Sequence, residues 1–224
     1  MSKYILYNSI ILGILIIFLS NSHVSVSFDK EDTVYIKLLG LPQKGICKDK
    51  NDTIKLIQQV VKVISNFGTL EPLPFGEIKN LKSFYNYKKG ICFDRSIVYE
   101  KIFSYYGFKT YHYFLAFNDN LAKTIFSRTT ISHTLVSVMV GKDEVFIDTN
   151  NYFVSVDFDN KPISNFIKKV STDNFGSPAL WWNVYFKKYR YSLIIRGMYS
   201  RNGDFFESLI KTPEFNFFDF KLIL

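Results

Sequence analysis

Apolar residues run without a polar face through the start of the chain. Residues 10–19 are apolar throughout, apart from Gly13. Such a stretch is short for a relaxed membrane span and typical of the core of a signal peptide. Small residues follow, so cleavage after Ser22 or Ser27 fits a signal peptidase site. We predict that residues 1–27 are a signal peptide or a membrane anchor, and that the protein is exported (periplasmic or secreted) or anchored to the membrane by this segment.

Hydrophobic spacing of 3.6 residues predicts two helices further along the chain. The first spans about residues 52–67 and stops at Gly68. The apolar face of this helix consists of Ile54, Ile57, Val61 and Ile64. The second begins after Gly90 and ends at Gly107, which suits the left-handed conformation of a helix end. Cys92 therefore lies at the N-terminus of the second helix.

Runs rich in β-branched and aromatic residues predict a sheet. Gly141-Lys142-Asp143 separates two of these runs and is a hairpin signal. Prolines punctuate residues 69–87, which we expect to be a loop, and residues 162–169 are a weak helix candidate. The expected fold class is α+β, a helix packed on an antiparallel sheet. The predicted strands are residues 33–39, 109–117, 132–140, 144–148, 152–156, 181–195 and 215–224.

Length and composition favour one folded domain over residues 28–224. The chain is 47% hydrophobic and 18% aromatic, far from the composition of disordered proteins. Its net charge of +8 attracts anionic partners without specificity. No run of five basic residues occurs, so we expect no nucleic-acid partner.

The two cysteines exclude a disulfide scaffold and a four-cysteine metal site. The three histidines and two cysteines show no close ligand spacing, so we expect neither a metal nor a cofactor. A disulfide between Cys47 and Cys92 is an open alternative in an exported protein. The other interpretation of Cys92 is chemical, because unpaired N–H groups and the helix dipole favour a thiolate at a helix N-terminus.

The predicted hairpin supplies partners for that thiol. If Gly141 and Lys142 form the loop, His133 lies opposite Asn150, and Asp148 is its diagonal neighbour on the same face. A cysteine nucleophile needs a histidine to move its proton and a carboxylate to orient the histidine. Cys92, His133 and Asp148 are therefore the candidate catalytic residues. His23 lies in the leader, and His112 lies mid-strand with no carboxylate at comparable spacing, so we expect His112 to be a core or surface residue of the strand.

At these residues the sequence resembles the transglutaminase-like superfamily, relatives of papain with a Cys-His-Asp triad. The matching elements are Gly90-x-Cys92 opening a helix, Gly107 closing it, His133 starting a strand and residues 146–149 ending the next. The resemblance covers about residues 52–156. Residues 89–93 (KGICF) are also similar to the cysteine motif of arylamine N-acetyltransferases, without the doubled glycine and arginine before the cysteine.

The resemblance implies a transglutaminase-like, papain-like core and a thiol enzyme, a cysteine protease, amidase or acyltransferase, that forms a thioacyl intermediate on a protein or peptide substrate. Membrane association through the N-terminus is a further expectation. The alternative is a catalytically silent domain of this fold that acts as a binding module. Asn86 is one candidate for a second oxyanion donor beside the Cys92 N–H. Subfamily and acyl acceptor stay open.

Overall fold

The structure is a computed structural model that describes residues 26–45, 47, 49–75, 77–120, 131–172, 182–189, 191–199, 214–215 and 221–223. Its mixture of helices and antiparallel strands confirms the α+β class. The predicted leader lies outside the described residues, except for positions 26–27. The helices are α2 (Asp32–Leu38), α3 (Lys50–Asn66), α4 (Leu81–Tyr87), α5 (Cys92–Tyr106), α7 (Phe166–Thr172) and α8 (Asn183–Lys188).

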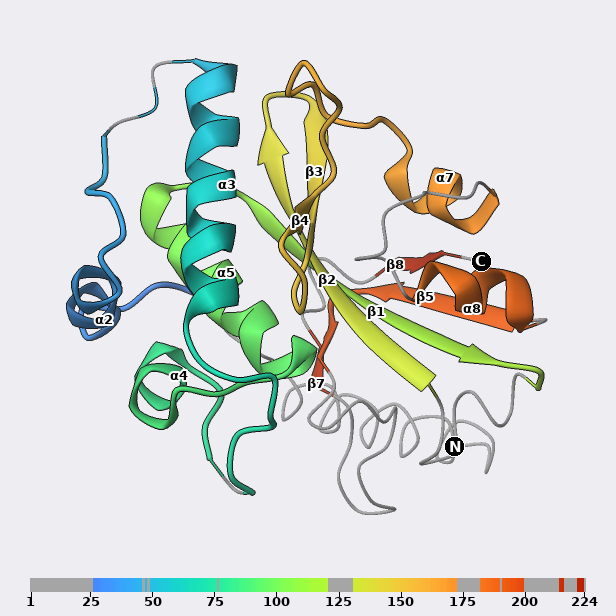
Figure 1. The fold of residues 1–224 in the computed structure, drawn as a ribbon, viewed down its shortest axis with the longest axis horizontal. Coiled ribbons are helices and arrows are strands. Elements are labelled where there is room, and N and C mark those ends of the chain that lie inside the picture. Colours follow the sequence, from blue (N-terminus) through green and yellow to red (C-terminus); the bar gives the residue numbers. More distant parts are fainter. Residues whose placement is uncertain are drawn as a thin grey trace, which may run out of the picture.

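The described strands form one large sheet in the order β4-β3-β2-β1-β5-β8, in which every neighbouring pair is antiparallel. A separate two-stranded ribbon joins β6 and β7. The strands are β1 (Thr110–Asn118), β2 (Ile131–Val140), β3 (Asp143–Asp148), β4 (Phe153–Val154), β5 (Tyr191–Arg196), β6 (Met198–Tyr199), β7 (Glu214–Phe215) and β8 (Lys221–Ile223). In Figure 1, α2, α3 and α4 lie on the left-hand side of the view, whereas α7 and α8 lie on the right-hand side, where α8 overlaps β5.

Apolar side chains on the two faces of the sheet pack against different helices. Val136, Val138 and Ile147 pack with residues of α3 and α5 in the largest buried cluster. Leu135 and Phe146, which point to the other face, pack with residues of α7 and with Trp182 before α8. The sheet is therefore the middle layer, and alternation along β2 assigns each side chain to one of two cores.

The two predicted helices in the first half are confirmed. The four predicted face residues of α3 are wholly buried, and Gly68 follows the helix with a φ of +93°. Helix α5 begins at Cys92 and ends before Gly107, whose φ is +85°. Its first twelve residues, 92–103, are all buried. Helix α5 is therefore enclosed on all sides over these twelve residues. The sequence pattern predicts only one buried face.

The predicted strand at residues 33–39 is wrong, because this segment forms α2. Asp29 and Asp32 accept hydrogen bonds from each other's backbone N–H groups, which closes the first turn. Lys101 on α5 then bonds to Asp32 at 2.7 Å and to Asp29 at 3.2 Å. Ile36 is buried in the core on the same helix. Tertiary contacts therefore override the β propensity of Thr33, Val34 and Tyr35.

Two more sequence predictions need correction. Residues 69–87, expected to be a loop, end in α4, where the side chain of Asn80 caps the helix by accepting from the N–H of Ser83. Residues 181–195, expected to be one strand, contain α8 before β5. In contrast, β1, β2, β3 and β4 overlap the predicted strands, and α7 overlaps the predicted weak helix.

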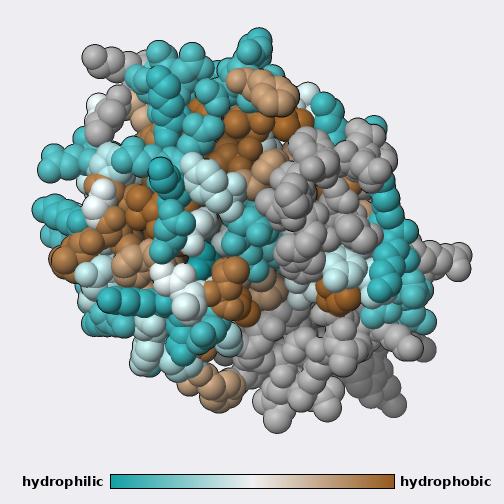
Figure 2. All heavy atoms as spheres, viewed as in Figure 1, coloured by the Kyte–Doolittle hydropathy of each residue, from teal (hydrophilic) through white to brown (hydrophobic). Residues whose placement is uncertain are grey.

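Some apolar side chains remain at the surface. Figure 2 shows apolar surface beside α2 and α3, where Val34 and Leu38 are each 54% exposed. Within the part of the chain that the structure describes, every helix is too short or too polar to cross a bilayer.

Candidate active site

Cys92 is the first residue of α5, and its position is fixed by the turn before it. The carboxylate of Asp94 accepts hydrogen bonds from the N–H of Ile91 at 3.1 Å and of Leu73 at 3.2 Å. Gly90 leaves little room for a side chain, because a Cβ there would lie 3.2 Å from both Asp94 and Phe84. Local hydrogen bonds therefore hold the nucleophile candidate at the helix N-terminus.

Arg95 ties the same turn to the end of α3. Its side chain is wholly buried, and its Nε donates to the Gly90 carbonyl oxygen at 2.7 Å. Its terminal nitrogens donate at 3.2 to 3.4 Å to the carbonyl oxygens of Ile64, Ser65, Gly68 and Thr69. Burial lowers the pKa of Arg95, although a guanidinium remains protonated in proteins. One buried cation thus joins three segments next to Cys92.

The hairpin has the register that the sequence predicts. Val140 pairs with Asp143 across a loop of Gly141 and Lys142, and Leu135 pairs with Asp148. His133 lies two residues before Leu135 on the same face of β2, so Asp148 is its diagonal neighbour. The imidazole Nε2 and Asp148 Oδ1 are 3.0 Å apart, and both side chains are buried.

Asp148 is held by four further donors from three residues. The backbone N–H groups of Asn150 and Asn151 donate to its Oδ1 at 3.0 and 3.3 Å, and Asn151 Nδ2 donates to Oδ2 at 2.9 Å. The indole Nε1 of Trp182 donates to Oδ2 at 2.7 Å. The Trp182 ring also stacks on His133, with centroids 5.7 Å apart. The carboxylate is therefore fully engaged and fixed in position.

Trp182 is a site residue that the sequence did not reveal. It lies 34 positions beyond Asp148. It belongs to a segment whose aromatic content predicted a strand. A buried tryptophan usually finds a partner for its N–H. From the sequence one can therefore expect the Trp182 N–H to have an acceptor, but the sequence does not identify Asp148 as that acceptor.

Cys92 lies close enough to His133 to act on its protonation. The thiol is one of the groups that raise the pKa of the histidine. The Nε2 atom of the ring is the one that bonds to Asp148. The structure thus brings together the three residues selected from the sequence, in the order thiol, imidazole, carboxylate.

The protonation of this pair follows from its surroundings. Burial alone would lower the pKa of His133, but the charge and hydrogen bond of Asp148, with Cys92, outweigh burial and raise it to about 10. Burial would raise the pKa of Asp148, but His133, Asn151 and Trp182 hold it below its ordinary value. The site therefore stabilises an imidazolium beside a carboxylate.

The raised pKa of His133 predicts that stability depends on pH. An exposed histidine titrates near 6.5, so the stabilisation from the protonated ring is fully present below about pH 6.5. It is lost as the pH rises toward the folded-state pKa of about 10. We expect the difference in Tm between the wild type and His133→Gln to shrink steadily over this range, as measured by circular dichroism. A difference that stays constant from pH 6.5 to 10 would contradict the assignment.

His112 has a carboxylate partner, contrary to the sequence interpretation. Its Nδ1 lies 2.9 Å from Glu100 Oε1, and Tyr199 donates to Glu100 Oε2 at 2.6 Å. All three are buried. Glu100 is eight residues after Cys92 on α5, which is a rise of about 12 Å. His112 therefore belongs to a separate buried cluster, and His133 is the histidine whose pKa Cys92 helps to raise.

The remaining candidates from the sequence are not part of this arrangement. Cys47 is a half-buried free thiol, and Cys92 is also free, so the structure does not contain the disulfide that the sequence left open. Asn86 is exposed on α4, where it lines a hollow with residues such as Glu31 and Lys82. Across the described ranges, no group of three or more His, Cys, Asp and Glu side chains is arranged to hold a metal ion.

Comparison of the chain with protein-family models, with curated proteins and with solved structures gave no match.

Proposed function

We propose that the protein is a thiol enzyme of transglutaminase-like type that acts on amides through Cys92, His133 and Asp148. The observation that carries the proposal is the buried hydrogen bond between His133 and Asp148, with Cys92 at the start of α5 among the groups that raise the pKa of the histidine. A helix N-terminus presents N–H groups without intrahelical acceptors, which suits both a thiolate and an oxyanion formed beside it.

The chemistry follows from the roles of the three groups. The Cys92 thiolate attacks the amide carbonyl, and the C–N bond breaks as the His133 imidazolium gives its proton to the departing amine. The result is a thioester on Cys92. Water or a second amine then attacks the thioester, His133 takes its proton, and the thiolate is released. The choice between hydrolysis and transfer depends on which acceptor reaches the thioester.

Burial favours a second candidate function for the same fold. Cys92 is 5% exposed, Asp148 is 1% exposed and His133 is wholly buried. A protein or peptide substrate reaches the thiol only if the surrounding surface opens. A domain that stays closed would be catalytically silent and would act through its surface as a binding module.

Alkylation by iodoacetamide separates the two functions, because the reagent is small and reacts with thiolates. We expect Cys92 to be labelled faster than Cys47, and faster than either thiol in the unfolded chain. Peptide mapping by mass spectrometry reads both rates in one sample, so Cys47 is an internal control. In His133→Ala we expect the rate at Cys92 to fall while the rate at Cys47 is unchanged.

Two outcomes would count against the enzyme. Cys92 could react no faster than in the unfolded chain, or at the same rate in the wild type and in His133→Ala. Either result would favour the silent binding module, because the thiol would then not be activated by the imidazole.

A further inference from the structure

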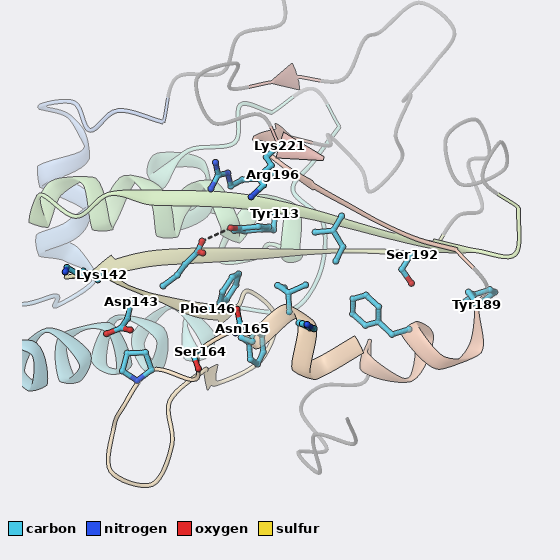
Figure 3. Close-up of a pocket in the computed structure, with 17 residues that line it drawn as sticks. Tyr113, Lys142, Asp143, Phe146, Ser164, Asn165, Tyr189, Ser192, Arg196 and Lys221 are labelled. Atoms are coloured by element: carbon cyan, nitrogen blue, oxygen red, sulfur yellow. Dashed lines mark hydrogen bonds between the residues drawn. The ribbon is translucent and has the colours of Figure 1, made fainter. Parts of the chain in front are cut away.

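A pocket of about 930 Å³ lies on the sheet face that α7 and α8 cover (Figure 3). Small-molecule sites in proteins have volumes of this order. Its lining comes from β1, β3, β5 and β8 of the sheet, from the β2–β3 turn, and from α7, the segment before α7, and α8. Cys92, His133 and Asp148 are not among the lining residues. The pocket is therefore distinct from the candidate active site.

The inner surface of the pocket is apolar and aromatic. Phe146 stacks on Phe166 with ring centroids 5.3 Å apart, and the ring of Tyr113 lies 5.2 Å from that of Phe146. Phe146 and Phe166 are both buried. The other apolar lining residues are Pro162, Ile167, Phe186 and Ile194. A flat or chain-like apolar group would displace water from this surface on binding.

A polar network crosses the strands at one wall. Tyr113 Oη donates to Glu144 Oε1 at 2.6 Å, a contact drawn as a dashed line in Figure 3, and Ser137 Oγ donates to the same oxygen at 2.6 Å. Arg196 is opposite Tyr113 in the β1–β5 register, and its guanidinium lies over the ring of Tyr111, 4.3 Å from the centroid. Burial and the neighbouring Glu144 raise the pKa of Tyr113, so the phenol stays protonated as a donor. The wall is therefore preorganised.

Positive charge dominates the rim. Both acids among the described lining residues already have partners, since Asp143 is ion-paired with Lys50 at 2.5 Å and Glu144 holds the two hydroxyls. The cations come from four separate elements of the chain, which together favour an anion at the rim. These basic lining residues are Lys142, Lys168, Arg196 and Lys221.

We propose that this pocket binds a single-chain anionic amphiphile, with its carboxylate or phosphate head at the basic rim and its apolar chain on the aromatic surface. The proposal goes beyond the thiol chemistry and does not depend on it. Phe166 and Phe186 line the pocket and also lie 6.3 and 5.9 Å, ring to ring, from Trp182. A bound chain would therefore be one aromatic layer away from the indole that holds Asp148.

Isothermal titration of the full chain tests the proposal, with dodecanoate and dodecyl phosphate as probes below their micelle-forming concentrations. We expect saturable one-site binding of at least one probe, and the tighter of the two identifies the head group. Lys168→Glu should weaken binding roughly three- to tenfold, because it reverses a charge at the rim. Lys142→Glu, in the β2–β3 turn, should weaken it similarly.

Lys169→Glu is the matched control. Lys169 is exposed and follows Lys168 on α7, but it does not line the pocket. The Lys169→Glu variant should therefore bind the probe with an affinity near that of the wild type. Three outcomes would overturn the proposal: neither probe saturates, Lys169→Glu weakens binding as much as Lys168→Glu, or uncharged dodecyl maltoside binds as tightly as the anions. Cys92 alkylation is read separately, so loss of one function does not imply loss of the other.

Discussion

Replacing Arg95 with Met is expected to lower the free energy of unfolding by roughly 3–5 kcal/mol, because it leaves buried carbonyl groups without their charged donor. The guanidinium bonds to five carbonyl oxygens, at the end of α3, in the turn that follows it and at Gly90. Met fills similar space but donates nothing. Arg95→Lys should recover only part of the lost free energy of unfolding, because one ammonium group cannot reach all the acceptors that surround a planar guanidinium.

Urea denaturation followed by circular dichroism measures this effect, and iodoacetamide labelling measures its consequence at the site. Arg95 fixes the Gly90 carbonyl group beside Cys92. In Arg95→Met we therefore expect Cys92 to be alkylated no faster than Cys47. Lys62→Met is the control, because Lys62 is an exposed cation on α3. A loss below about 1 kcal/mol in Arg95→Met would mean that the carbonyls find other donors.

The parts of the site that could be predicted are those that local sequence determines. The helical period and Gly107 fixed the limits of α5, so the position of Cys92 followed. The turn at Gly141-Lys142 fixed the β2–β3 register, and a register determines which side chains share a face. His133 and Asp148 could therefore be paired without knowledge of the rest of the chain.

The parts that could not be predicted depend on partners distant in sequence. Arg95 bonds to carbonyl groups 26 to 31 residues earlier, and Trp182 bonds to a carboxylate 34 residues earlier. The helix at residues 33–39 depends in part on Lys101, which is 69 positions beyond Asp32. Periodicity and propensity describe neighbours along the chain, so they carry no information on such contacts.

The resemblance to transglutaminase-like enzymes rests on the same local signals. It predicts the three site residues and the α+β class, and the α+β class is what the structure shows. Trp182 lies outside the segment that the resemblance covers, yet it completes the surroundings of Asp148. The assignment to this superfamily and its chemistry therefore remains a proposal whose tests are chemical.

Asp148→Asn is the decisive variant for the chemistry, because it removes one charge and preserves the shape of the side chain. In the wild type the carboxylate accepts from His133, Asn151 and Trp182, and it raises the pKa of the histidine toward 10. An amide presents an NH₂ group to some of these donors. The imidazolium therefore loses its main stabilising charge, and the ring loses the acceptor that orients it.

We expect the alkylation rate of Cys92 at pH 6 to fall in Asp148→Asn by roughly a hundredfold, the lower end of what a positioned acid–base group contributes. Trp182→Phe keeps an aromatic ring beside His133 but removes the N–H donor, so a smaller fall is expected. The rate at Cys47 in the same samples controls for reagent and pH. If Asp148→Asn labels Cys92 as fast as the wild type does, the carboxylate does not support the imidazolium, and the thiol is activated by the helix N-terminus alone.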